Sequence, residues 1–246
     1  MGASEVFVIS VLILVAATLY SCVGHAGASG YLAIMALASV DAQVMKPTAL
    51  GLNVLVALIA SVRFYRAGCF SWTLLWPFAV TSVPAAVAGG FLTLPTTLYR
   101  QVVGLVLLYA AYRLFRGHSA TEGVTIRPPP RVLALGLGAG IGLLSGLTGV
   151  GGGIFLSPLL LLAGWADPRR TAGVSAVFIL VNSLAGLAGH LAAIPHLPAT
   201  IAPWAVAAII GGVLGSEIGS RRLEMRKLRR VLALVLLVAS AKLIFV

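Results

Sequence analysis

Two glycine-rich stretches, residues 24–30 (GHAGASG) and 146–153 (GLTGVGGG), interrupt long apolar segments at corresponding places in the two halves of the chain. Glycine adopts backbone conformations that end a helix, so each stretch is expected to break the helix that contains it. A lipid bilayer offers no water to the freed N–H and C=O groups, so an irregular stretch inside it persists only against protein or a polar cavity. Paired breaks of this kind are typical of transporters.

The composition places the chain in a membrane. Of its 246 residues 60% are hydrophobic and 9% are charged, whereas soluble domains are about 45–50% apolar. We therefore predict an all-α polytopic membrane protein. Residues 1–23 lack a basic start and a convincing cleavage site, and we interpret them as a retained helix. Cys22 and Cys69 fit no disulfide or metal pattern and are interpreted as buried thiols.

Two predicted repeats divide the chain. Each is a glycine-broken helical hairpin, over residues 6–38 or 132–163, followed by three transmembrane helices. The predicted units are an N-terminal membrane repeat (1–116), a proline-rich cytoplasmic linker (117–131) and a C-terminal membrane repeat (132–246). The six single spans are expected at residues 48–62, 72–92, 101–115, 171–191, 201–219 and 231–246.

The basic residues predict the topology. Fourteen of the 17 Lys and Arg residues lie in loops that alternate with loops holding only Lys46, Arg100 and Lys242. The richer loops are expected to be cytoplasmic, which inverts the two repeats and places both termini outside a bacterial cytoplasmic membrane. The net charge of +11 is then explained by topology and by contact with anionic lipid, and no nucleic-acid motif accompanies it.

Three charged or titratable side chains have specific expected places. Glu217 is expected to pair with the Arg221 and Arg222 side chains near the cytoplasmic end of its span. His190 and His196 are expected at an external helix end in contact with water. No acidic relay is evident within the spans, so the sequence names no coupling ion.

The candidate site consists of the two breaks and the small polar residues near them. The helices that resume at Tyr31 and Ile154 present unpartnered N–H groups and the positive end of the helix dipole to an anion. Small hydroxyls and amides suit an oxyanion. The substrate-binding candidates are Gly24, His25, Gly27, Ser29, Gly30, Tyr31, Thr48, Asn53, Ser145, Thr148, Gly149, Gly151, Gly152, Gly153, Thr171 and Ser175, while Asn182 is divided between this role and helix packing.

These motifs resemble those of the sulfite exporter TauE/SafE family of membrane anion transporters. The resemblance rests on residues 142–158 (GLLSGLTGVGGGIFLSP), on 171–175 (TAGVS) and on 47–53 (PTALGLN), and it extends over nearly the whole chain. It implies transport of sulfite, a sulfonate or a related organosulfur anion. The first break departs from the family's usual glycine run at His25, Ala26, Ala28 and Ser29, which leaves the substrate open.

We therefore predict a secondary transporter or facilitator of a small sulfur-containing oxyanion, working by alternating access. Its partners are a small anionic substrate and membrane lipid, without nucleic acid, and no catalysis, metal or cofactor is expected. One alternative is a rhomboid-like intramembrane protease with Ser29 as nucleophile and His190 as base. A second alternative is an anion channel on the same scaffold. Transport direction and oligomeric state stay open.

Overall fold

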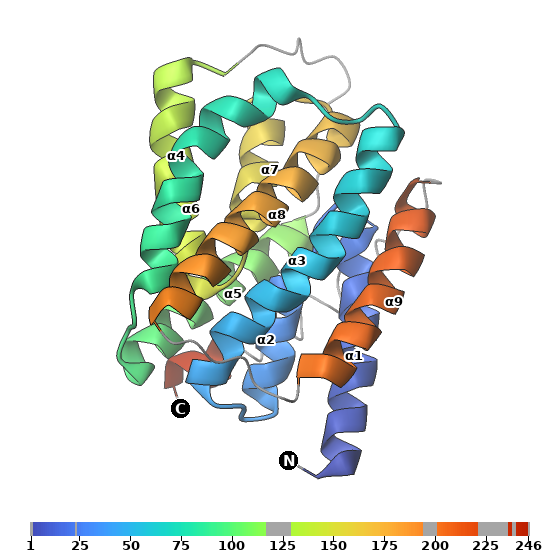
Figure 1. Cartoon of the computed structure of the whole chain (residues 1–246), viewed down its shortest axis with the longest axis vertical. Coiled ribbons are helices and arrows are strands. Elements are labelled where there is room, and N and C mark those ends of the chain that lie inside the picture. The colour runs from blue at the N-terminus through green and yellow to red at the C-terminus, as the bar shows by residue number, and fades with distance from the viewer. Residues whose placement is uncertain are drawn as a thin grey trace.

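A computed structural model describes residues 2–22, 24–116, 129–193, 201–220, 236–237 and 240–245. Within these ranges the chain forms helices and no strand (Figure 1). The helices are α1 (Ala3–Ser21), α2 (Ala28–Leu37), α3 (Ala42–Arg66), α4 (Trp72–Phe91), α5 (Thr96–Arg116), α6 (Arg131–Thr148), α7 (Gly153–Leu162), α8 (Pro168–Ala193) and α9 (Ile201–Ser220).

Six of the described helices, α1, α3, α4, α6, α8 and α9, are long and apolar enough to cross a membrane, which confirms the prediction of a polytopic membrane protein. Helix α5 is not among them, although a span was predicted over residues 101–115. Helix α3 begins at Ala42, six residues before the predicted start, because the side chain of Asp41 accepts a hydrogen bond from Gln43 N–H and caps the helix there. The predicted span 231–246 lies mostly outside the described residues.

Both predicted hairpins are present. Helix α1 runs from the end of the molecule that carries the N-terminus to its middle, and α2 returns to the same end, whereas α6 and α7 enter and leave from the opposite end (Figure 1). At 1.5 Å per residue the ten residues of α2 extend about 15 Å, half of a hydrocarbon core of about 30 Å. Helix α2 begins at Ala28 rather than Tyr31, and α7 begins at Gly153. The relation of the halves as inverted repeats stays a prediction.

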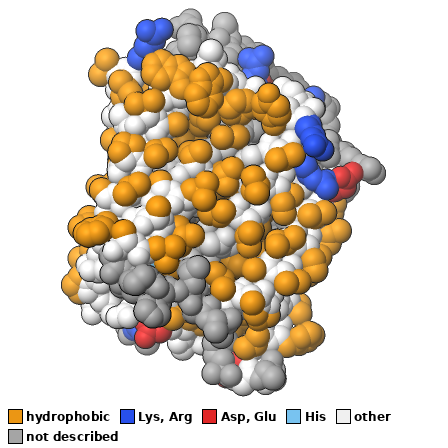
Figure 2. All heavy atoms as spheres, viewed as in Figure 1, with side chains coloured by type: hydrophobic (Ala, Val, Ile, Leu, Met, Phe, Trp, Pro, Cys, Tyr) orange, Lys and Arg blue, Asp and Glu red, His pale blue; other side chains and the backbone are white. Residues whose placement is uncertain are grey.

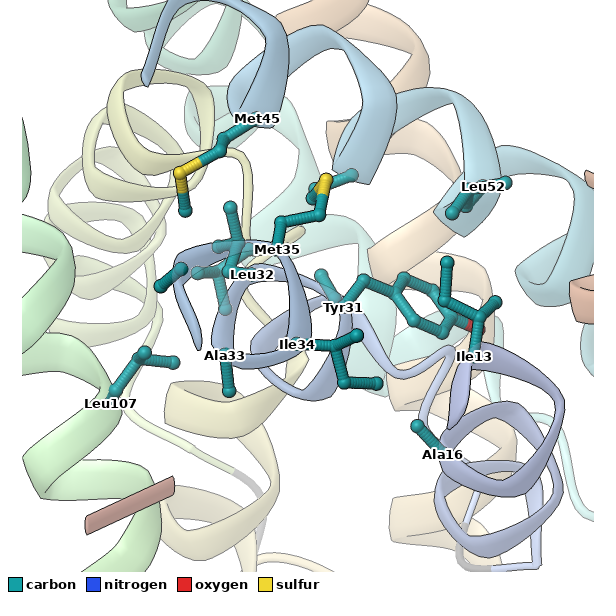
Figure 3. Packing of buried hydrophobic residues seen from close by; sticks show 14 of the residues in the cluster. Ile13, Ala16, Tyr31, Leu32, Ala33, Ile34, Met35, Met45, Leu52 and Leu107 are labelled. Carbon is teal, nitrogen blue, oxygen red and sulfur yellow. The ribbon is translucent and has the colours of Figure 1, made fainter. Parts of the chain in front are cut away.

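Helix α2 lies in the interior of the bundle. Residues 28–36 are all buried, and Figure 3 shows Tyr31, Leu32 and Met35 enclosed by residues of α1, α3 and α5. A helix that is apolar on every side is stable only when it is surrounded by other elements. The first break is therefore held at depth within the protein, where its backbone groups meet protein rather than lipid.

Close helix crossings hold the second break in place. Helix α4 packs against α6 and α8, and a Cβ added at Gly146 of α6 would meet the carbonyl oxygen of Ala86 on α4. Glycines at such crossings let two backbones approach closely, which compensates for the absence of a hydrophobic driving force inside lipid. Helix α6, which leads into the second break, is thus fixed against α4.

Apolar side chains cover most of the surface visible in Figure 2, and Lys and Arg side chains gather toward its upper part. Arg63, in the last turn of α3, pairs with Glu217 of α9. The predicted pairing of Glu217 with Arg221 and Arg222 lies outside the described residues. The distribution matches a chain surrounded by lipid with one basic end.

Candidate functional site

Both breaks begin a helix in the interior of the protein without a side-chain cap. Gly27 precedes α2 with φ of 104°, and Gly152 precedes α7 with φ of 79°. Neither helix start receives a hydrogen bond from a capping side chain. The first N–H groups of a helix have no intrahelical acceptor and carry the positive end of the dipole. Two helix N-termini, from opposite halves of the chain, thus end inside the molecule.

A small cavity lies between the two breaks. Its lining combines residues of the first break with residues at the second break and on α8, so the two irregular segments meet across it. The lining residues are Tyr20, His25, Ala26, Gly27, Ala28, Ser29, Val150, Ile154 and Ile179. Of the predicted site residues, His25, Gly27 and Ser29 line this cavity.

A hydrogen-bonded chain joins the first break to the second hairpin. Nε2 of His25 lies 3.1 Å from Oγ of Ser157 on α7, and Ser157 Oγ donates to Oγ of Ser175 on α8 at 2.8 Å. A serine hydroxyl has one proton. Because Ser157 gives that proton to Ser175, Nε2 of His25 is the donor in the other contact. Ser157 was not predicted, although its position one turn after Gly153 was a usable signal.

Asn53 of α3 binds the second break directly. Its Nδ2 donates to the carbonyl of Val150 at 3.2 Å and to Oγ of Ser183 at 3.4 Å. Gly151 lies against this contact, since a Cβ added there would be 2.6 Å from Asn53 Nδ2. Ser183 was also missed by the sequence reasoning, yet it follows Ser175 by eight residues and so lies on the same face of α8.

Several predicted site residues carry buried oxygens without a hydrogen-bond partner. Among the described residues these include Oγ1 of Thr48 and Thr171, Oγ of Ser145 and Oδ1 of Asn53, together with Oδ1 of Asn182. Buried polar atoms are almost always paired, and an unpaired group costs about 1–3 kcal/mol. Such atoms need water or a ligand. Ser145 adjoins the second break, because a Cβ added at Gly152 would lie 3.5 Å from its Cβ.

Other predicted site residues form internal contacts that shape the breaks. Ser29 Oγ donates to Tyr20 Oη at 2.7 Å, Tyr31 Oη donates to the Ala26 carbonyl at 2.6 Å, and Thr148 Oγ1 donates to the Leu144 carbonyl at 2.6 Å. The glycines lie in close packing: Gly24 against Ala172, Gly30 against Tyr20 and Ala16, Gly149 against Lys46, and Gly153 against Ile179.

Two placements predicted from the sequence are wrong. Lys46 is not in an external loop, because α3 begins before it and its side chain is buried. His190 lies in the last turn of α8, but its predicted contact with water is wrong, because only 4% of the residue is exposed. His196 lies outside the described residues.

The protease alternative requires a hydrogen bond between Ser29 and His190. Ser29 Oγ instead donates to Tyr20 Oη, and no described hydrogen bond joins Ser29 to His190.

The cysteines and acids supply no metal site among the described residues, where no three His, Cys, Asp or Glu side chains lie together. Cys69 is buried as predicted, whereas Cys22 is half-buried and its Sγ contacts the Thr18 carbonyl. The described chemistry of the site therefore consists of helix N-termini, hydroxyls, amides and one imidazole.

In the part of the chain that the structure describes, six helices long and apolar enough to cross a membrane define a multi-pass membrane protein, and two helix breaks lie in its interior. A family model described as "Sulfite exporter TauE/SafE" matches residues 9–243, so the chain belongs to this family. It is 39% identical over 245 residues to "Probable membrane transporter protein y4hK" of Sinorhizobium fredii (strain NBRC 101917 / NGR234), with 98% of this chain and 99% of the relative covered. No solved structure matches the chain. The chain is thus a membrane transporter by family.

Proposed function

We propose that this transporter carries a small sulfur-containing oxyanion, such as sulfite or an organosulfonate, which binds between the two glycine breaks. The observation that supports this proposal is the meeting of the two breaks at one cavity, where α2 and α7 both begin without a side-chain cap. Backbone N–H groups at helix N-termini bind anions without a charged side chain. The substrate class itself comes from the family to which the chain belongs.

The unpartnered hydroxyls give the site its selectivity in this proposal. Ser145 and Thr171 carry buried oxygens that bind nothing in the described structure, and each is free to donate a hydrogen bond to an oxyanion. Asn53 and Ser175 contribute indirectly, because they hold the second break and Ser157 in place. Backbone groups near Ser29 and Gly152 bind the anionic group.

Transport then proceeds by alternating access. The two hairpins enter the molecule from opposite ends, so a relative movement of the halves opens the shared cavity first toward one end and then toward the other (Figure 1). The His25–Ser157 hydrogen bond joins the hairpins and is expected to break in this movement. We place the basic end of the molecule in the cytoplasm and both termini outside a bacterial cytoplasmic membrane.

The test is anion-dependent thermal stabilisation of purified protein by sulfite, thiosulfate, sulfate, sulfoacetate and taurine, with a neutral solute as control. A ligand stabilises the folded protein by RT ln(1 + [L]/Kd), about 2.7 kcal/mol at one hundred times Kd. Stabilisation by a sulfur oxyanion and not by the neutral solute supports the proposal. No response to any anion contradicts it.

A matched pair of variants locates the site. Ser145→Ala removes a hydroxyl without a partner at the second break, so the unliganded protein is expected to keep its stability while the anion response weakens. Ser61→Ala removes an equally buried, unpartnered hydroxyl two turns beyond Asn53, about 12 Å along α3. Ser61→Ala is expected to leave the thermal response to the anion unchanged.

Uptake into proteoliposomes that saturates with concentration, without channel-like conductance, distinguishes a transporter from a channel.

A further inference from the structure

Lys46 is a buried positive charge without an acidic partner. Its ammonium donates to three backbone carbonyls at the end of α4, those of Gly89 at 3.2 Å, Gly90 at 2.8 Å and Leu92 at 3.0 Å. The residue is only 5% exposed. These contacts satisfy all three N–H bonds of the ammonium group. They leave its charge only partly balanced, because a helix C-terminus carries about half of a negative charge.

No acid among the described residues provides the missing balance. The chain has six Asp and Glu residues, and four of them lie within the described ranges. All four are engaged elsewhere: Glu5 binds Gly2 N–H, Asp41 caps α3, Asp167 caps and pairs with residues of α8, and Glu217 pairs with Arg63. An ionised group that is buried within a membrane protein is costly, and it usually marks a substrate or ion pathway.

His190 of α8 supplies a second group of the same kind in the same region. It is 4% exposed, and its Nδ1 is buried without a hydrogen-bond partner. The neighbouring Gly189 packs against the last turn of α4, near Phe91 N and the Val87 carbonyl, so α8 meets the helix end that binds the ammonium. A buried ring nitrogen without a partner needs water or a ligand to satisfy it.

This region also adjoins the second break. A Cβ added at Gly149, the residue that ends α6, would lie 3.0 Å from the carbonyl oxygen of Lys46. Helix α3 starts at the end of the molecule to which α2 returns (Figure 1). Lys46 thus lies between that end and the break, on the side of the cavity opposite to the basic end.

From these contacts we propose that Lys46 and His190 form a second anion-binding position, at which the ammonium of Lys46 balances the charge of the transported anion and His190 Nδ1 donates a hydrogen bond to it. The inference rests on the proposed function, since the anion is the one carried through the glycine breaks. It adds a fixed charge to a site otherwise built from backbone and hydroxyl groups. An anion that moves between the second break and the end of the molecule that carries the N-terminus passes this position.

The test measures sulfite and thiosulfate binding by thermal shift, and saturable uptake into proteoliposomes, for Lys46→Gln, Lys46→Arg and the wild type. Lys46→Gln is expected to weaken binding by about tenfold or more, because it removes the balancing charge. Lys46→Arg is expected to restore most of the affinity. Lys242→Gln is the matched control, since the Lys242 ammonium also donates to a helix-end carbonyl, that of Leu37 at 2.9 Å, but from an exposed position.

A purely structural role for Lys46 predicts a different pattern. In that case Lys46→Gln lowers the melting temperature of the unliganded protein, but the increase in melting temperature on adding the anion and the KM for uptake stay as in the wild type. This result overturns the inference. If Lys46→Gln does not fold, His190→Phe decides, because His190 Nδ1 makes no contact to lose. His190→Phe is expected to raise KM about threefold to tenfold, and an unchanged KM overturns the inference. An absent response in the wild type instead contradicts the proposed function.

Discussion

Gly151→Ala tests how tightly the second break is held. Gly151 has φ of 80°, a conformation that costs a residue with a Cβ about 1–2 kcal/mol. The added Cβ would also lie 2.6 Å from Asn53 Nδ2 and 2.8 Å from Ser183 Oγ, so at least one of these side chains must move. Overpacking costs about 1–3 kcal/mol, and a weakened hydrogen bond about 0.5–1.5 kcal/mol more. We expect a destabilisation of about 3–5 kcal/mol.

Gly68→Ala separates the backbone cost from the packing cost. Gly68 also has a positive φ, of 70°, but a Cβ added there meets nothing within 4 Å. Gly68→Ala is expected to lower the free energy of unfolding by only about 1–2 kcal/mol. Thermal unfolding in one detergent compares the two variants, and for a chain of this size each kcal/mol corresponds to about 2–4 °C. The two losses differ by at least about 1 kcal/mol, so the melting temperature of Gly151→Ala is expected to lie at least about 2 °C below that of Gly68→Ala.

Equal melting temperatures for these two variants would refute this reasoning, because the Asn53–Ser183 contact would then adapt to the methyl group without cost. A decrease in melting temperature for Gly68→Ala but not for Gly151→Ala would refute it as well. Binding of anions need not be known for either result. The comparison therefore tests the geometry of the break independently of the proposed substrate.

Three further predictions concern the scaffold. Gly146→Ala is expected to lower the free energy of unfolding by more than about 3 kcal/mol or to prevent folding, because the added Cβ meets backbone atoms of α4. Gly140→Ala is the control on the same helix, since a Cβ there meets nothing within 4 Å. It is expected to raise the free energy of unfolding by about 0.5–1 kcal/mol in the same thermal assay. Tyr31→Phe leaves a buried carbonyl of the first break unpartnered and is expected to cost about 1–3 kcal/mol in denaturant or thermal unfolding; no loss would show that another donor replaces the hydroxyl. The Arg63–Glu217 pair is partly exposed, so a double-mutant cycle with Arg63→Gln and Glu217→Gln is expected to give a coupling below about 1 kcal/mol, and a larger value would contradict this.

The sequence predicted much of the fold because the signals are local. Apolar length sets which segments can cross a membrane, and glycine sets where a helix breaks, so the two hairpins and most of the spans were predicted close to their observed places. The start of α3 was missed because the predicted span followed the apolar stretch from residue 48, whereas the cap at Asp41 begins the helix at Ala42. Pattern alone could not show that Lys46 continues the helix.

The candidate site was predicted by residue type but not by partner. The sequence itself determined the membrane class, the breaks, and the small hydroxyls and amides near them. Only the tertiary structure decided that His25 binds Ser157, that Asn53 binds the second break, and that Lys46 and His190 are buried. The two hydrogen bonds join residues more than 90 positions apart in the sequence. These bonds and the burial of Lys46 and His190 depend on how distant helices cross. A hydropathy pattern is a property of one helix, whereas a hydrogen bond between helices is a property of their packing.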